Sequence, residues 1–132
     1  MKEFSSVDAA ILLLESDPVT RTVLCEALRN AGYLVATASN LGTAIERLEE
    51  VRPDLLIIPP YINSMPGHIA ADYLRSKQPG LPVLVVAGFP DDDRITIRNS
   101  IRGFHTFPSP FNREEFIAKV REVLKYQSKM AA

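Results

Sequence analysis

The stretch Ala9-Ala-Ile-Leu-Leu-Leu-Glu-Ser-Asp-Pro18 decides how the rest of the chain is interpreted. It begins with a continuous apolar run, which is typical of a strand that is buried on both faces of a sheet. It ends with an aspartate suited to the N-cap and a proline suited to the first position of a helix. We therefore expect a strand over residues 9–14 and a helix over residues 18–31, which together form one α/β repeat.

The same alternation continues to the end of the chain. Apolar runs predict further strands at residues 33–38, 54–58, 82–87 and 104–107, and 3.6-residue periodicity predicts helices at residues 40–51, 68–77, 92–102 and 113–127. Asn40 and Asn112 are suited to cap two of these helices, and Gly32 is suited to end the first one. Five strand–helix repeats favour a doubly wound α/β fold, with a five-stranded parallel sheet covered by helices on both faces.

The composition indicates one globular domain. The chain has 132 residues, of which 46% are hydrophobic and 23% are charged. Its 15 basic and 16 acidic side chains give no electrostatic reason to expect binding to nucleic acid or to a membrane. One cysteine excludes an internal disulfide, and no apolar run approaches the length of a membrane span. We expect a cytoplasmic protein with a domain at residues 9–127 and short tails at residues 1–8 and 128–132.

Ligands of such a sheet bind outside the carboxyl ends of the strands. The first expected strand ends there on two carboxylates, Glu15 and Asp17. These side chains either bind a divalent ion together, or Asp17 caps the helix and Glu15 is hydrated or bonded locally. Two carboxylates alone rarely form a dedicated Mg²⁺ site, so we expect no bound metal and no cofactor.

Four motifs occur in a characteristic order and spacing. They are Ile11-Leu-Leu-Leu-Glu-Ser-Asp-Pro-Val-Thr-Arg21, Arg52-Pro-Asp-Leu-Leu-Ile-Ile58, Met65-Pro-Gly67 and Ser109-Pro-Phe111. Together they resemble the receiver domain of two-component response regulators, and the resemblance covers nearly the whole chain. It implies a CheY-like, flavodoxin-like three-layer sandwich with strand order 2-1-3-4-5. It also favours a cis peptide bond before Pro110.

The resemblance also indicates which positions form the family's phosphorylation pocket. The phosphoacceptor aspartate falls on Pro59, the acidic pair on Glu15 and Ser16, the hydroxyl residue on Ala87 and the lysine on Ser109, while Asp17 is a neighbouring acid that the family often carries. Aspartyl phosphorylation requires a carboxylate nucleophile and Mg²⁺, and proline has no nucleophilic atom. We therefore expect a pseudo-receiver, which has the receiver frame without the phosphorylation switch.

A stripe of arginines marks the helix expected at residues 92–102. Arg94, Arg98 and Arg102 recur every four residues, and Ile97 and Ile101 add apolar surface beside them. In the family, this helix, the strand after it and the last helix form the usual surface for dimers and outputs. The stripe is therefore either a docking face for a protein partner, since arginine is enriched in interfaces, or an ordinary solvated helix face.

The leading functional hypothesis is a phosphorylation-independent docking module whose partner is a kinase, another regulator or a second copy of the chain. One alternative is a phosphorylatable receiver with a displaced acceptor, for which Asp54 and Asp72 are the nearest acids. Another is a small-molecule binder whose altered pocket is walled by Pro59, Gly88, Phe89 and Ser109. An enzyme is the least favoured class, because no nucleophile has a base or metal ligand beside it.

Overall fold

The computed structural model describes residues 9–87, 102–108 and 112–131. Its main sheet has five parallel strands: β1 (Ala10–Leu14), β2 (Leu34–Ala38), β3 (Leu55–Ile58), β6 (Val83–Ala87) and β7 (His105–Pro108). They are arranged in the order β2-β1-β3-β6-β7. Counted along the chain, this is the 2-1-3-4-5 order that the resemblance implied, so the expected α/β fold is confirmed.

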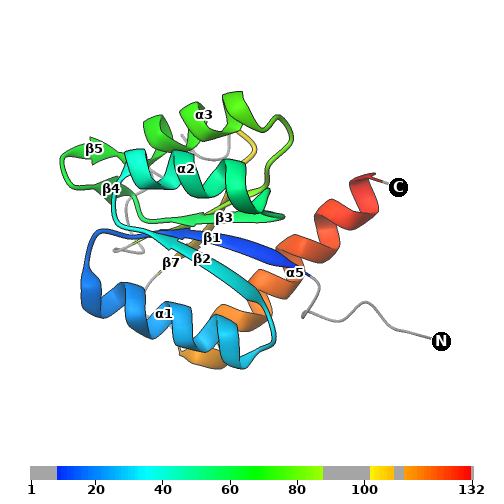
Figure 1. Ribbon diagram of the computed structural model, residues 1–132. Coiled ribbons are helices and arrows are strands. Elements are labelled where there is room, and N and C mark those ends of the chain that lie inside the picture. Colours follow the sequence, from blue (N-terminus) through cyan, green and yellow to red (C-terminus); the bar gives the residue numbers. More distant parts are fainter. Residues whose placement is uncertain (1–8, 88–101, 109–111, 132) are drawn as a thin grey trace.

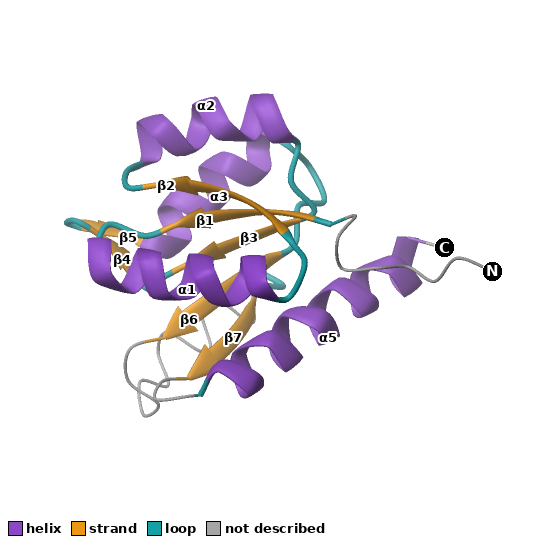
Figure 2. Ribbon diagram, turned by 60° about the horizontal axis from the view of Figure 1, so that its bottom comes forward, coloured by secondary structure: helices purple, strands orange, loops and turns teal. Residues whose placement is uncertain are grey.

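Helices cover both faces of the sheet (Figures 1 and 2). The helices α1 (Pro18–Asn30) and α5 (Arg113–Ala131) lie on one face, and α2 (Leu41–Val51) and α3 (Gly67–Lys77) lie on the other. Successive residues of β1 point to opposite faces: Ile11 belongs to the core beneath α1 and α5, and Leu12 belongs to the core beneath α2 and α3. Burial on both faces explains why this strand is apolar without interruption.

The helix starts follow the expected caps. Asp17 Oδ2 accepts hydrogen bonds from Thr20 N at 2.8 Å and from Thr20 Oγ1 at 2.6 Å. Asn40 Oδ1 accepts a hydrogen bond at 2.8 Å from the backbone N of Thr43, the third residue of α2. Asn112 and Glu115 cap each other reciprocally, with Glu115 N donating to Asn112 Oδ1 at 2.7 Å and Asn112 N donating to Glu115 Oε1 at 3.0 Å.

The C-terminal boundary differs from the expectation. We expected the last helix to end at residue 127 and a tail to follow, but α5 continues to Ala131. The added residues, Ser128 to Ala131, include lysine, methionine and alanine, which are good helix formers, and no glycine or proline that would stop the helix. The helix expected at residues 92–102 lies outside the described residues, except for Arg102.

A short hairpin between β3 and α3 was not predicted. The strands β4 (Tyr61–Ile62) and β5 (Met65–Pro66) pair antiparallel around Asn63, whose φ of 55° is left-handed. The hairpin returns the chain so that Gly67 N donates a hydrogen bond to Pro60 O. Strands of two residues have no apolar periodicity, so the sequence pattern does not reveal them.

No helix in the described part of the chain is long and apolar enough to cross a membrane.

Candidate functional site

The carboxyl ends of β1, β3 and β6 bring the expected pocket residues to one edge of the sheet. Leu13 is paired with Ile57, so Glu15 and Pro59, two residues further on, follow at the same level. Ile58 is paired with Val85, which places Ala87 at the same edge, at the end of β6. Ser109 belongs to the pocket by resemblance only, because it lies outside the described residues.

Glu15 is a buried carboxylate that is bonded locally. Glu15 is 9% exposed, and its Oε2 accepts a hydrogen bond from Asp17 N at 2.9 Å. Burial raises the pKa of Glu15 above its ordinary value, and the negative charge of Asp17 acts in the same direction. The hydrogen bond from Asp17 N and the charge of Arg21 lower the pKa but do not cancel the effect of burial.

Asp17 acts as the helix cap that the second of our two interpretations assigned to it. Its carboxylate is exposed, and the hydrogen bonds from Thr20 lower its pKa below the ordinary value. One carboxylate is therefore buried and bonded to the loop, whereas the other is turned to the first turn of α1. Among the described residues, no group of three or more histidine, cysteine, aspartate or glutamate side chains is arranged to hold a metal ion.

Arg21 is a site residue that the sequence analysis missed. From the first turns of α1, its Nη1 donates to Glu15 O at 2.9 Å and to Ser16 O at 3.4 Å. The guanidinium thus fixes the backbone of the loop between β1 and α1 and adds positive charge near Glu15. Its place three residues beyond Pro18, on the first turn after the cap, was the available signal.

Pro59 and Pro60 form the turn that follows β3. Both are half-buried, and Gly67, at the start of α3, is packed against their backbone. Neither proline side chain can accept a phosphoryl group, because neither has a nucleophilic atom.

The two acids considered as displaced acceptors are both occupied elsewhere. Asp54 precedes β3, and its Oδ2 accepts from Ala10 N at 2.8 Å, at the edge of the sheet where strands begin. Asp72 lies on α3, and its Oδ2 is 2.9 Å from Arg102 Nε. Neither carboxylate lies at the carboxyl end of a strand.

Of the expected docking face, only Arg102 is among the described residues, and Arg94, Ile97, Arg98 and Ile101 are not. Pro110, the expected cis-proline, also lies outside the described residues. Arg102 is half-buried and ion-paired with Asp72, rather than continuing an open stripe. Its carbonyl oxygen accepts a hydrogen bond from Arg75 Nη1 at 2.8 Å, and the Arg75 guanidinium lies 4.7 Å from the centre of the Phe104 ring. Periodicity within one helix cannot reveal such contacts with a different helix.

Comparison with known proteins agrees with the fold described above. Residues 11–121 match the response regulator receiver domain. The chain is 29% identical to a probable transcriptional regulatory protein, TcrX, of Mycobacterium tuberculosis, over 95% of this chain and 53% of TcrX. It is 34% identical to the DNA-binding transcriptional regulator NtrC of Bradyrhizobium, over 87% of this chain and 24% of NtrC.

Solved structures show the same architecture. A CheY-like receiver domain protein from Methanospirillum hungatei superimposes with a TM-score of 0.82 at 20% identity, covering 92% of this chain and 98% of that one. The chain spans about half of the length of TcrX and about a quarter of the length of NtrC. The match over residues 11–121 and the shared fold lead to one conclusion: the chain belongs to the response regulator receiver domain family.

Proposed function

We propose that this receiver domain does not accept a phosphoryl group and acts as a phosphorylation-independent module that docks a protein partner. The observation that carries the proposal is Pro59, which follows β3 at the level of Glu15, the residue after the neighbouring strand β1. In the family, the phosphoacceptor aspartate occupies this position. A proline there removes the nucleophile of the reaction.

The rest of the edge also offers little to a phosphoryl group. Mg²⁺ in phosphate sites is held by one or two carboxylates together with the phosphate. Glu15 is buried and bonded to the loop, Asp17 is occupied as a helix cap, and Ala87 replaces the hydroxyl of the family pattern. The charges at this edge also differ from those of the family pattern. Ser109 stands where the family has a lysine, and Pro59 stands where it has a carboxylate, so one positive and one negative charge are both missing.

The alternative of a displaced acceptor has weaker support. A phosphoryl group on Asp54 would lie at the opposite edge of the sheet, where this carboxylate bonds to the start of β1. A phosphoryl group on Asp72 would break the ion pair with Arg102. The contacts of both residues therefore favour structural roles.

The partner is a protein in the leading interpretation, since receiver domains interact with kinases and regulators. The arginine stripe remains the surface that we propose for docking, with Arg98 at its centre. We propose no enzymatic activity, because Pro59 offers no nucleophile and no group of three or more histidine, cysteine, aspartate or glutamate side chains among the described residues is arranged to hold a metal ion.

Intact-protein mass spectrometry tests the proposal. The chain is incubated with Mg²⁺ and acetyl phosphate, beside a phosphorylatable receiver domain as a positive control. We expect no phosphoryl adduct on this chain while the control is labelled. An adduct that disappears in Asp54→Asn or in Asp72→Asn would establish a displaced acceptor and overturn the proposal.

A further inference from the structure

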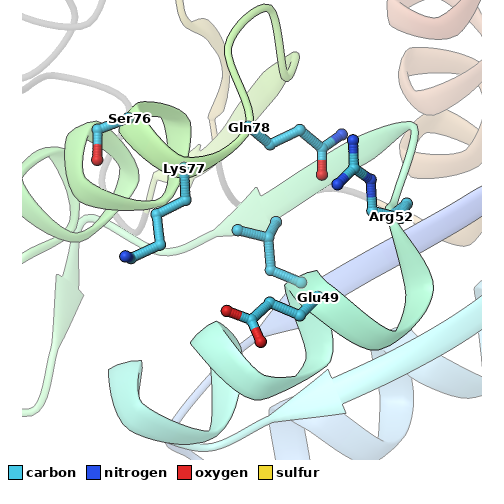
Figure 3. A pocket seen from close by; sticks show the side chains of 6 residues that line it. Glu49, Arg52, Ser76, Lys77 and Gln78 are labelled. Carbon is cyan, nitrogen blue, oxygen red and sulfur yellow. The ribbon is translucent and has the colours of Figure 1, made fainter.

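A separate cavity lies at the opposite edge of the sheet, between the C-terminal ends of α2 and α3 (Figure 3). It has a volume of about 380 Å³, and the residues that line it are Leu48, Glu49, Arg52, Ser76, Lys77 and Gln78. The strands β3 and β6 begin at this edge, whereas Glu15, Pro59 and Ala87 lie where strands end. Its volume is at the lower end of the range for small-molecule sites.

Three charged side chains line the cavity without neutralising one another. Figure 3 shows Lys77 on the left of the view, Arg52 and the side-chain amide of Gln78 on the right, and Glu49 between them in the lower part. Within the described part of the chain, the side chains of Glu49 and Arg52 form no ion pair or hydrogen bond. Lys77 Nζ lies 5.3 Å from the centre of the Tyr73 ring, a weak contact that leaves its hydrogen-bond donors available. The cavity thus presents two cations and one anion.

Gln78 adds an acceptor that lacks a donor. Its Nε2 donates to Pro53 O at 2.8 Å, which fixes the orientation of the side-chain amide. Its Oε1 is buried and has no hydrogen-bond partner among the described residues. A buried acceptor without a donor costs free energy, so a donor that reaches Gln78 from the cavity would be favoured.

The two helix ends favour positive charge in the ligand as well. The C-terminus of a helix carries a partial negative charge, and α2 and α3 both end at the cavity. Arg52, the residue that ends α2, adopts a left-handed conformation with φ of 52°. An ammonium group would therefore meet two helix ends, the Glu49 carboxylate and the Gln78 acceptor.

We propose that this cavity binds a small acidic α-amino acid, which has one ammonium group and two carboxylates. The ammonium group matches Glu49 and the free acceptor of Gln78, and the carboxylates match Arg52 and Lys77. The net charge of the ligand, −1, is opposite to the net charge of the three lining side chains, +1. Leu48 gives the methylene groups of such a ligand an apolar contact. The site does not depend on the proposed docking function.

Two-dimensional ¹H–¹⁵N NMR titration of the full chain with L-aspartate and with L-glutamate tests the proposal. We expect saturable shifts of the backbone amides of Arg52, Lys77 and Gln78 with at least one of the two amino acids. Succinate lacks the ammonium group and L-alanine lacks the second carboxylate, so each should bind at least about tenfold more weakly. Binding of succinate as tight as that of L-aspartate would overturn the assignment of the ammonium site.

Variants of the two cations locate the binding. Lys77→Gln should weaken binding at least about tenfold, and so should Arg52→Asn, because asparagine tolerates the left-handed backbone at that position. Lys125→Gln, an exposed lysine on α5, is the matched control and should leave the affinity unchanged. The absence of saturable shifts up to about 10 mM amino acid, or unchanged affinity in both cation variants, would overturn the proposal.

Discussion

A Cβ atom on Gly67 would lie 2.1 Å from the carbonyl oxygen of Pro59. The same atom would lie 3.0 Å from the carbonyl oxygen of Pro60, so any side chain at position 67 meets backbone on two sides. The first residue of α3 therefore has to be a glycine if the helix is to start against the turn that follows β3. This close approach links the turn after β3 to the start of α3.

The Gly67→Ala variant should lose roughly 2–3 kcal/mol of unfolding free energy, because backbone atoms have to move to admit the methyl group. Urea denaturation followed by circular dichroism measures the loss. Gly42→Ala is the control within α2, where the added Cβ would lie 3.3 Å from Asn40 Oδ1, and its unfolding free energy should change by less than about 1 kcal/mol. If Gly67→Ala lowered the unfolding free energy by no more than Gly42→Ala does, the backbone of Pro59 and Pro60 would not require a glycine at position 67.

The unfolding free energy should depend more on Arg75 than on Asp72. Arg75 donates to Leu81 O at 3.1 Å and to Arg102 O at 2.8 Å, so its removal leaves two carbonyl groups without their donor. Arg75→Ala should cost about 2–3 kcal/mol. Asp72→Asn removes only a partly exposed ion pair and should cost less than about 1 kcal/mol. Parallel urea titrations of both variants give this order, and the reverse order would contradict it.

The buried Glu15 should make the chain more stable on mild acidification. Its pKa is raised in the folded chain, mainly by burial, so the folded state binds a proton more readily than the unfolded state does. The contribution of Glu15 to the unfolding free energy is fully present below the ordinary pKa of glutamate, and it is lost as pH rises through the raised pKa of the folded chain. Glu15→Gln retains an acceptor for Asp17 N and should remove this pH dependence from denaturation curves between pH 4 and pH 7, a range chosen around the ordinary glutamate pKa of about 4.3. An unchanged pH profile in the variant would contradict the prediction.

His105 should have the opposite effect. Burial lowers its pKa, the charges of Lys119 and Arg75 lower it further, and Glu122 raises it. The unfolded state therefore binds the proton more readily, and the contribution of His105 is complete above the ordinary histidine pKa of about 6.5 and is lost as pH falls below it. An NMR titration of the imidazole resonances measures the shift directly. A midpoint above that of a histidine-containing peptide would contradict it.

Two arginines of the stripe should have different roles, Arg98 in docking a partner and Arg102 in stabilising the fold. Arg98→Glu should abolish partner binding without changing the melting temperature. Arg102→Glu should lower the melting temperature, because the new carboxylate would face Asp72 instead of pairing with it. Co-purification of partners and differential scanning fluorimetry measure the two effects, with Glu46→Lys on the exposed face of α2 as the charge-reversal control. Unaltered binding by the Arg98→Glu chain would remove the docking hypothesis.

Local pattern alone was enough to locate the described helices and the strands of the main sheet. The uninterrupted apolar run of β1 reflects burial on both faces, and Asp17, Asn40 and Asn112 mark helix starts through side-chain caps that act within three residues. The position of Pro59 after β3 was also evident in the sequence, because a strand and the residue after it are read from one short segment. Propensity, periodicity and capping are properties of neighbouring residues, so the sequence displays them directly.

Contacts between side chains that are distant in the sequence could not be predicted from local pattern, because the packing of the helices determines them. The ion pair between Asp72 and Arg102 joins residues that are 30 positions apart, and the bond from Gln78 to Pro53 spans 25 positions. Each of these contacts exists only because α3 packs beside a segment that is remote in the chain. The cavity between the ends of α2 and α3 has the same origin, since neither helix contains it alone. The sequence by itself therefore determined the described helices, the strands of the main sheet, the helix caps and the proline after β3, and only the tertiary structure decided which distant side chains meet.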